Sequence, residues 1–132
     1  MGIANGDSLP VAICTDSAQG HEIKLVEKTI AHRFTKKKPR RLIGDRAYDS
    51  DPLDKQLRQQ RIELIAPHKS NRKKKKTQDG RTLRKYRSRW KIERLFAWIQ
   101  NFRRCLTRFE YYQENFLGFL RWACIVLLIK YF

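Results

Sequence analysis

The chain has 132 residues, enough for one domain with its own core and too short for two comfortable ones. Hydrophobic residues make up 41% and aromatic residues 11%, which argues against an intrinsically disordered chain. Thirty Lys and Arg against thirteen Asp and Glu give a net charge of +17, which would repel itself on a compact surface without a polyanionic partner. Nucleic acid is the first candidate and an anionic membrane surface the second.

The first third of the chain predicts a strand followed by a helix. The apolar run Pro10–Thr15 follows a Gly-Asp-Ser turn signal and has the length of a strand. Apolar residues then recur at helical spacing after Glu22, whose acidic side chain suits the first turn of a helix. These apolar residues are Ile23, Val26, Ile30 and Phe34.

The middle of the chain predicts a second strand, a helix and a third strand. The short apolar run in RLIGD ends at Asp45, which indicates a buried strand with a carboxylate at its C-terminal end. Ser50 or Asp51 is a suitable helix cap, with Pro52 in the first turn. The run IELIAP, residues 62–67, reads as the third strand. Strands and helices that alternate in this way predict an α/β sheet built from crossover units.

Beyond the third strand, a basic loop precedes two long helices. KSNRKKKKTQDGR, residues 69–81, contains no apolar residue and ends in an Asp-Gly turn. Helical patterns follow from Tyr86 to Arg104 and from about Gln113 to the end. The aromatic residues of these patterns are expected in the core or in helix packing, since aromatic residues at helical spacing seldom mean base stacking unless exposed. They are Trp90, Phe96, Trp98 and Trp122.

The ends of the chain and its cysteines bear on location. FLGFLRWACIVLLIKYF has 17 residues with Arg121 near its middle, too short for a bilayer-spanning helix, so a buried terminal helix and no membrane partner are expected. MGIANGDSLP has no charged leader before an apolar run, so no secretory signal is expected. Cys14, Cys105 and Cys124 have no zinc-site spacing and are expected to be reduced, as in the cytoplasm.

The first long helix carries an apolar face and a polar face. At 100° per residue, its apolar side chains fall within an arc of about 80° and predict a buried face. They are Ile92, Leu95, Ile99, Phe102 and Leu106. Tyr86, Arg89, Glu93 and Gln100 fall on an arc about 40° wide, roughly opposite the first. Glu93 is then either the surface ion-pair partner of Arg89, four residues earlier, or a metal ligand.

Asp45 favours the metal interpretation of Glu93. A carboxylate at the C-terminal end of a strand lies where α/β sheets place ligand-binding groups, although it also suits a simple cap. Two carboxylates, Asp45 and Glu93, could share Mg²⁺ or Mn²⁺, because these cations prefer hard oxygen ligands. Phosphoryl transfer uses such a metal to activate the attacking oxygen and neutralise the leaving one. The surrounding cations would then hold the phosphates of DNA.

Three segments carry a family resemblance. RLIGDRAYDS, APHKSNRKK and YRSRWKIERLFAWIQNFRRCLTRFE resemble the C-terminal half of bacterial insertion-sequence transposases with a DDE active site. The resemblance extends to DSLPVAICTDSAQGHE and so covers nearly the whole chain, residues 1–132. It implies an α/β fold of the ribonuclease-H-like type, incomplete at its N-terminus, with two long C-terminal helices. It also implies a bacterial cytoplasmic protein associated with the nucleoid.

The resemblance assigns roles to two acidic residues. Gly44, Asp45 and Tyr48 match the Gly-Asp-x-x-Tyr context of the family's second acid. The third acid lies in a pattern of Tyr, two residues, Arg, three residues, Glu, six residues, Lys. Tyr86, Arg89 and Glu93 match this pattern, whereas position 100 is Gln. Asp45 and Glu93 are thus the implied catalytic and metal-binding residues, with Tyr86 and Arg89 positioning phosphate or supporting Glu93.

Other basic residues complete the implied DNA-binding set. Lys73, Lys74, Lys75 and Lys76 in the basic loop are expected to contact phosphates without reading sequence. Lys91, Arg94, Arg103 and Arg104 are the cations that could replace the family's lysine at position 100.

The first acid of the family's triad has no match here. It lies upstream of the segment that DSLPVAICT resembles, and the resemblance assigns neither Asp7 nor Asp16 to it. The chain is therefore expected to be part of a transposase that cleaves DNA and transfers strands when intact. The alternative is a non-catalytic basic DNA-binding module or a decayed transposase remnant. The expected partners are DNA, as transposon ends and target, and either a second copy of this chain or an upstream transposase chain.

Overall fold

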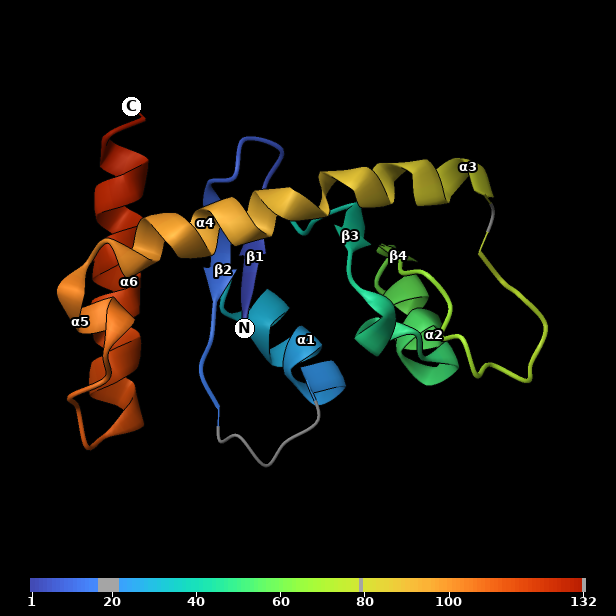
Figure 1. Ribbon diagram of the computed structural model, residues 1–132, viewed down its shortest axis with the longest axis horizontal. Coiled ribbons are helices and arrows are strands. Elements are labelled where there is room, and N and C mark those ends of the chain that lie inside the picture. Colours follow the sequence, from blue (N-terminus) through green and yellow to red (C-terminus); the bar gives the residue numbers. More distant parts are fainter. Residues whose placement is uncertain (17–21, 79, 132) are drawn as a thin grey trace. The chain divides into compact units, whose positions relative to one another are not determined.

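The computed structural model describes residues 1–16, 22–78 and 80–131, and it divides into two compact units (Figure 1). One unit combines Met1–Lys36 with Trp90–Phe132, and the other is Lys37–Arg89. Each unit contains helices and a small sheet, so the chain has a mixed α/β structure. The basic loop predicted over residues 69–81 lies in the second unit, with residue 79 outside the described residues.

The sheet of the first unit is an antiparallel pair of strands. β1 (Gly2–Ala4) pairs with β2 (Pro10–Ile13), so that Gly2 lies opposite Ile13. The turn between them is closed by the side-chain oxygen of Asn5, which accepts the backbone N–H groups of Asp7 and Leu9 at 2.8 and 2.9 Å. The strand predicted at Pro10–Thr15 is confirmed, whereas β1 has too few residues to give a periodic sequence signal.

The helix α1 (Glu22–Ala31) follows the pattern predicted for it as far as Ile30. Val26, Thr29 and Ile30 are buried. The prediction is wrong for Phe34, which lies beyond the helix and is 41% exposed. Its backbone N–H donates to the carbonyl of Val11 at 2.8 Å, so a bond to β2 replaces the next turn of the helix.

Three helices complete the first unit: α4 (Trp90–Gln100), α5 (Arg103–Leu106) and α6 (Gln113–Ile129). α4 packs against β1 and α6. Leu95 and Ile99 are buried, which confirms the centre of the predicted apolar face. The side chains of this core come from β2, α4 and α6, and they are Ile13, Leu95, Ile99, Leu120, Ala123 and Cys124.

The single helix predicted from Tyr86 to Arg104 is wrong at both ends. Tyr86 lies in η2 (Arg84–Arg89), a 3₁₀ helix that precedes α4. At the other end, Phe102 has extended backbone angles (φ −86°, ψ 113°) and separates α4 from α5. This change of direction takes Leu106 off the predicted apolar face, and it is 63% exposed. Phe102 itself still packs, partly buried, against the core.

The terminal helix α6 is buried on one side only. Leu120, Ala123 and Cys124 face the core, but Trp122 and Ile129 are 66% and 69% exposed. The prediction of a buried helix is therefore wrong for its outer side. The core placement is also wrong for Trp90 and Phe96, which are 45% and 37% exposed. Among the described residues, no helix has both the length and the apolar character needed to span a bilayer.

The second unit contains the predicted crossover. β3 (Arg41–Ile43) leads through η1 (Arg46–Tyr48) and α2 (Asp51–Gln59) to β4 (Glu63–Ile65), which pairs parallel with β3. The hydroxyl of Ser50 accepts the N–H of Leu53 at 3.5 Å, so Ser50 rather than Asp51 is the helix cap. The buried apolar side chains of this unit include Leu53, Leu57, Ile62, Leu64 and Ile65.

Two features of the second unit differ from expectation. β3 is not a buried strand, since Arg41 is exposed and Ile43 is 37% exposed. The described strands also form two sheets of two strands, where the sequence predicted one sheet with three strands. Beyond the basic loop, this unit ends in α3 (Gly80–Leu83) and η2.

Candidate catalytic and DNA-contacting residues

Asp45 lies directly after β3, at the C-terminal end of the strand as predicted. Its Oδ1 accepts the N–H of Ala47 at 2.8 Å and so caps η1. Gly44 precedes it because the ring of Tyr48 folds back over this position: a Cβ on residue 44 would lie 2.8 Å from Tyr48 Cδ2. The Gly-Asp-x-x-Tyr pattern is thus a packed strand-to-helix turn that presents a carboxylate at the strand end.

The carboxylate of Asp45 has the chemistry of a metal ligand. Its side chain is exposed, and the bond to Ala47 uses Oδ1. In the described part of the chain, Oδ2 has no hydrogen-bond partner, which leaves a hard oxygen donor for a cation. A cap and a ligand are therefore compatible roles for this one side chain, and Asp45 fits one position in the coordination shell of Mg²⁺ or Mn²⁺.

Glu93 lies in the first turn of α4 and is exposed. It belongs to the first unit, whereas Asp45 belongs to the second. Within the described residues, no group of three or more His, Cys, Asp and Glu side chains is arranged to hold a metal ion. A metal shared by Asp45 and Glu93 therefore stays a prediction from the sequence.

Tyr86 and Arg89 come together in η2. The guanidinium carbon of Arg89 lies 5.8 Å from the centre of the Tyr86 ring, within the range of a cation–π contact. The 3₁₀ helix brings this pair together because side chains three residues apart eclipse one another in such a helix. The contact orients the positive charge of Arg89 beside Tyr86.

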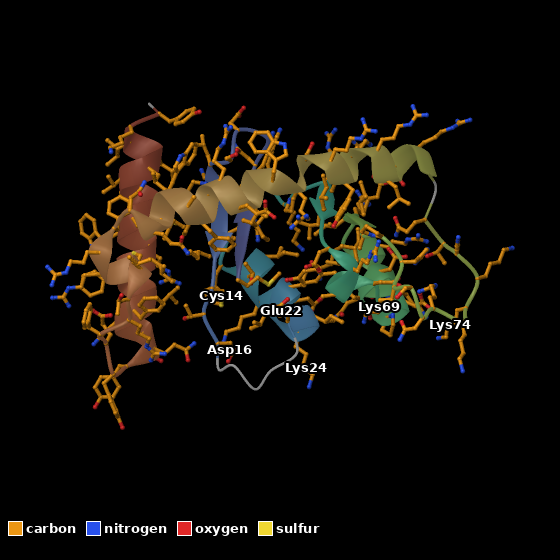
Figure 2. The ribbon with its side chains drawn as sticks, in the orientation of Figure 1. Cys14, Asp16, Glu22, Lys24, Lys69 and Lys74 are labelled. Atoms are coloured by element: carbon orange, nitrogen blue, oxygen red, sulfur yellow. The ribbon has the colours of Figure 1, made fainter. Side chains whose placement is uncertain are left out.

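The side chains of Lys73, Lys74, Lys75 and Lys76 are all exposed. Figure 2 shows Lys69 close to the helical part of the unit and Lys74 on the outer part of the loop. Lys74 also lies 3.6 Å from a carboxylate oxygen of Asp51, a weak surface ion pair. The loop therefore presents four ammonium groups to solvent, as the sequence predicted.

Arg103 and Arg104 differ in what they contact. Arg103 is exposed at the start of α5. Arg104 donates to Glu110 at 3.0 Å and stacks over the Phe119 ring at 5.2 Å. The Glu110 carboxylate is only 6% exposed; burial alone would raise its pKa, but the bonds from Arg104 and from backbone amides hold that pKa below its ordinary value. Arg104 therefore has a structural partner in this unit.

Sequence reasoning missed a partly buried polar cluster, here named the anchor cluster, made of Asp49, His68 and Arg72. The Asp49 carboxylate is 7% exposed and accepts from His68 Nδ1 at 2.9 Å and from Arg72 Nη1 at 3.0 Å. It also accepts the backbone N–H of Lys69 at 2.8 Å. Burial alone would raise the pKa of Asp49, but these donors outweigh it and hold the pKa below its ordinary value.

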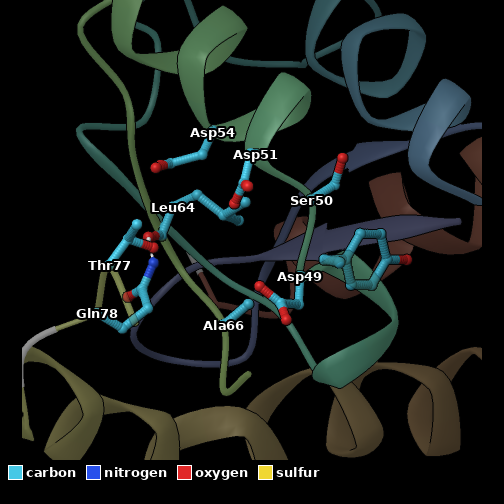
Figure 3. Close-up of a pocket in the computed structure, with 9 residues that line it drawn as sticks. Asp49, Ser50, Asp51, Asp54, Leu64, Ala66, Thr77 and Gln78 are labelled. Atoms are coloured by element: carbon cyan, nitrogen blue, oxygen red, sulfur yellow. Dashed lines mark hydrogen bonds between the residues drawn. The ribbon is translucent and has the colours of Figure 1, made fainter. Parts of the chain in front are cut away.

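The anchor cluster borders a small polar cavity. The cavity has a volume of about 10 Å³, close to the space of one water molecule, and Asp49 and Thr77 help to line it (Figure 3). Gln78, on the same wall, donates from Nε2 to the carbonyl of Leu64 at 3.2 Å. The end of the basic loop is thus fastened to β4 beside the cluster.

The second unit thus combines a parallel strand crossover, a carboxylate at a strand end and a loop of exposed lysines. Among protein families, the model of the family described as the transposase DDE domain matches residues 2–128. The chain therefore belongs to the DDE transposase family.

A relative among curated proteins extends this result. Over 90 residues, the chain is 36% identical to a protein of Burkholderia cepacia whose name assigns it as transposase for insertion sequence element IS402. The aligned segment covers 68% of this chain and 39% of the relative. The chain thus spans well under half the length of the relative that it matches. No solved structure matches this chain.

Proposed function

We propose that this chain is the part of an insertion-sequence transposase that provides Asp45 and Glu93 as metal ligands and holds DNA through its phosphates. The observation that carries the proposal is the position of Asp45, exposed at the end of β3 with one oxygen uncommitted, in a chain of the DDE family. When bound there, Mg²⁺ or Mn²⁺ would activate the attacking oxygen and neutralise the leaving one. The reactions are hydrolysis of the phosphodiester at the transposon end, which frees a 3′-hydroxyl, and attack of that hydroxyl on a target phosphodiester, whose own 3′-oxygen leaves.

The residues of the chain divide the work of binding. Asp45 offers its Oδ2 and keeps Oδ1 on the Ala47 amide, which fixes the direction of the carboxylate. We assign Arg89, whose guanidinium lies beside the Tyr86 ring, to neutralise a phosphate in the DNA backbone. Lys73–Lys76 provide sequence-independent contacts, since ammonium groups on an exposed loop bind phosphates as point charges.

DNA binding is tested by fluorescence anisotropy with duplex DNA over a range of salt concentrations. If six or more phosphates are contacted, affinity falls by about 10³ or more between about 50 and 200 mM salt. Replacing Lys73–Lys76 by Ala reduces the magnitude of the slope of log K against log salt by up to about 3.6, because each of four phosphate contacts contributes about 0.9. A flat salt response in the parent chain contradicts phosphate binding.

A charge-matched variant separates the effect of the loop lysines on DNA binding from the effect of net charge. It replaces four exposed lysines elsewhere, Lys24, Lys36, Lys38 and Lys55, by Ala. Both variants lower the net charge equally, but only the loop variant removes the proposed contacts, so its affinity falls further and its salt slope changes more. Equal losses in the two variants contradict a specific role for the loop.

Catalysis is tested by an assay of end cleavage and strand transfer with Mg²⁺ or Mn²⁺. The chain alone is expected to be inactive, because two carboxylates hold a metal pair poorly without a third. Activity is expected when the family's N-terminal segment is supplied on the same chain or in trans, and Asp45→Asn or Glu93→Gln then abolishes it. Cleavage by these residues alone that Asp45→Ala removes shows that the first acid has been misassigned. DNA binding with no activity in any arrangement favours the non-catalytic module.

A further inference from the structure

The tautomer of His68 follows from its hydrogen-bond partners. The backbone N–H groups of Thr77 and Gln78 both point at His68 Nε2, at 3.0 and 3.2 Å. A backbone N–H can only donate, so Nε2 is an acceptor and carries no proton. The proton of the neutral ring is then on Nδ1, which donates to Asp49 at 2.9 Å. One imidazole, 10% exposed, thus joins the end of the basic loop to the Asp49 carboxylate.

Arg72 holds the middle of the same loop. Its guanidinium is 11% exposed and spans two carboxylates, with Nη1 on Asp49 at 3.0 Å and Nη2 on Asp51 at 2.7 Å. Nε and Nη2 also donate to the backbone carbonyl of Lys75, at 3.3 and 3.2 Å. Asp49 in turn accepts the N–H of Lys69 at the start of the loop. The backbone of residues 69–78 is therefore fastened at its start, middle and end to the anchor cluster.

The loop separates its basic residues into two classes. The Arg72 guanidinium donates its hydrogen bonds to the Asp49 and Asp51 carboxylates and to the Lys75 carbonyl, whereas the side chains of Lys73–Lys76 are exposed. We propose that Asp49, His68 and Arg72 are positioning residues that preorganise the loop, so that Lys73–Lys76 meet the DNA backbone in a fixed arrangement. This inference rests on the proposed phosphate-binding function of the loop.

The physical reason is the entropy of ordering. A loop without apolar residues has no core contact of its own to hold it, so when free it would have to become ordered as DNA binds. Fixing the backbone beforehand removes that loss from the binding step and raises affinity without adding a contact. Loss of an anchor is therefore expected to weaken binding while the lysines, and hence the number of phosphate contacts, stay the same.

Arg72→Lys is the decisive variant, because it keeps the charge but removes the planar fork that reaches Asp49, Asp51 and the Lys75 carbonyl together. We expect affinity for duplex DNA about tenfold lower at one salt concentration, with the salt slope of the parent. The matched control is Arg40→Lys, an exposed arginine of the same unit, which is expected to bind as the parent does.

Two variants of His68 separate its two bonds. Asn places its amide N near the Nδ1 position and keeps the donor to Asp49, whereas Gln places its oxygen near the Nε2 position and keeps the acceptor for Thr77 and Gln78. His68→Asn is expected to weaken binding about tenfold, and His68→Gln to retain most of the affinity. His32→Asn, on an exposed histidine of the other unit, is the control.

Amide hydrogen exchange and ¹⁵N chemical shifts measure the hydrogen bonds of the anchor cluster directly. In the parent, the ring nitrogens of His68 are expected to show the Nδ1–H tautomer, and the amides of Thr77 and Gln78 to exchange slowly. In His68→Asn these two amides exchange fast while that of Lys69, bound to Asp49, stays protected. The amides of β4 report whether the unit remains folded; if His68→Asn unfolds it, Arg72→Lys decides.

The outcomes are distinct. Parent-like affinity of Arg72→Lys and His68→Asn, in folded protein whose Lys73–Lys76→Ala variant has a reduced salt slope, overturns the positioning role and leaves the proposed function intact. An unchanged salt slope in Lys73–Lys76→Ala overturns the phosphate role of the loop, and the positioning role with it. Lower affinity of the anchor variants with a parental salt slope supports both.

Discussion

Leu95→Ala is the substitution that tests the core of the first unit. Leu95 is fully buried between β2 and α6, so the change removes three carbon atoms that are shielded from water. At about 0.8 kcal/mol per buried methylene, their transfer accounts for roughly 2.5 kcal/mol. The void left in a closed core adds to this, so the expected loss in the free energy of unfolding is about 2.5–4.5 kcal/mol.

The control for this prediction is Leu106→Ala, the same chemical change at a side chain that is 63% exposed. Its expected effect is within about 0.5 kcal/mol, as for surface substitutions in general. A continuous helix through Leu106 would instead place both leucines on one buried face. The pair of variants therefore tests the extended Phe102 that separates α4 from α5.

Urea unfolding followed by tryptophan fluorescence measures both variants. Trp90, Trp98 and Trp122 all belong to the first unit, so the signal reports its unfolding and not that of the second unit. Leu95→Ala is expected to lower the midpoint with little change in the slope of free energy against urea. Equal losses in Leu95→Ala and Leu106→Ala, or no loss in either, contradict the described packing of α4.

Three further predictions concern single groups. Gly44→Ala is expected to destabilise the second unit by about 1–3 kcal/mol in urea unfolding, because its Cβ would force the Tyr48 ring to move; no loss contradicts the packed turn. The lowered pKa of Asp49 means that its contribution to stability is complete above its ordinary pKa of 3.8 and is lost as pH falls through the lower folded value. The free energy of unfolding of the whole chain, followed by circular dichroism, should therefore fall more steeply below about pH 4 in the parent than in Asp49→Asn, and parallel curves refute this. Burial, with a smaller effect of Cys105, raises the pKa of Cys124 to about 12, so at pH 8 about one thiol in 10⁴ is ionised. Alkylation of Cys124 is therefore expected only after the chain unfolds, and rapid labelling of the folded chain would contradict that burial.

Periodic sequence patterns predicted the features that depend on neighbouring residues, namely the buried face of a helix and the strand crossover. Leu95 and Ile99 recur at helical spacing and are buried, and the crossover from β3 to β4 follows its turn and capping signals. The end of α4 was not predictable in this way, because Phe102 stays apolar and in phase while its backbone becomes extended. Side-chain identity reports which face is apolar, and the backbone angle at one residue decides where that face ends.

The candidate site likewise has parts that the sequence predicted and a part that it did not. Asp45 at the strand end and the exposed Lys73–Lys76 follow from position and charge. The anchor cluster does not, because Asp49 and His68 are 19 residues apart and meet only through tertiary structure. Single polar residues do not recur at a fixed spacing, so a hydrogen-bond network such as this one cannot be recognised from the sequence before the fold is known.

All four described strands are edge strands, since each pairs with one other strand only, apart from one bridge between Ala12 and Arg33. Exposed edges can recruit the strands of other chains into aggregates. The strands here are only three or four residues long, β2 begins with a proline that has no N–H to donate, and Arg41 and Glu63 form an ion pair between β3 and β4. Short, charged and proline-flanked edges are poor templates, so the strands of this strongly basic chain resist pairing with those of other copies.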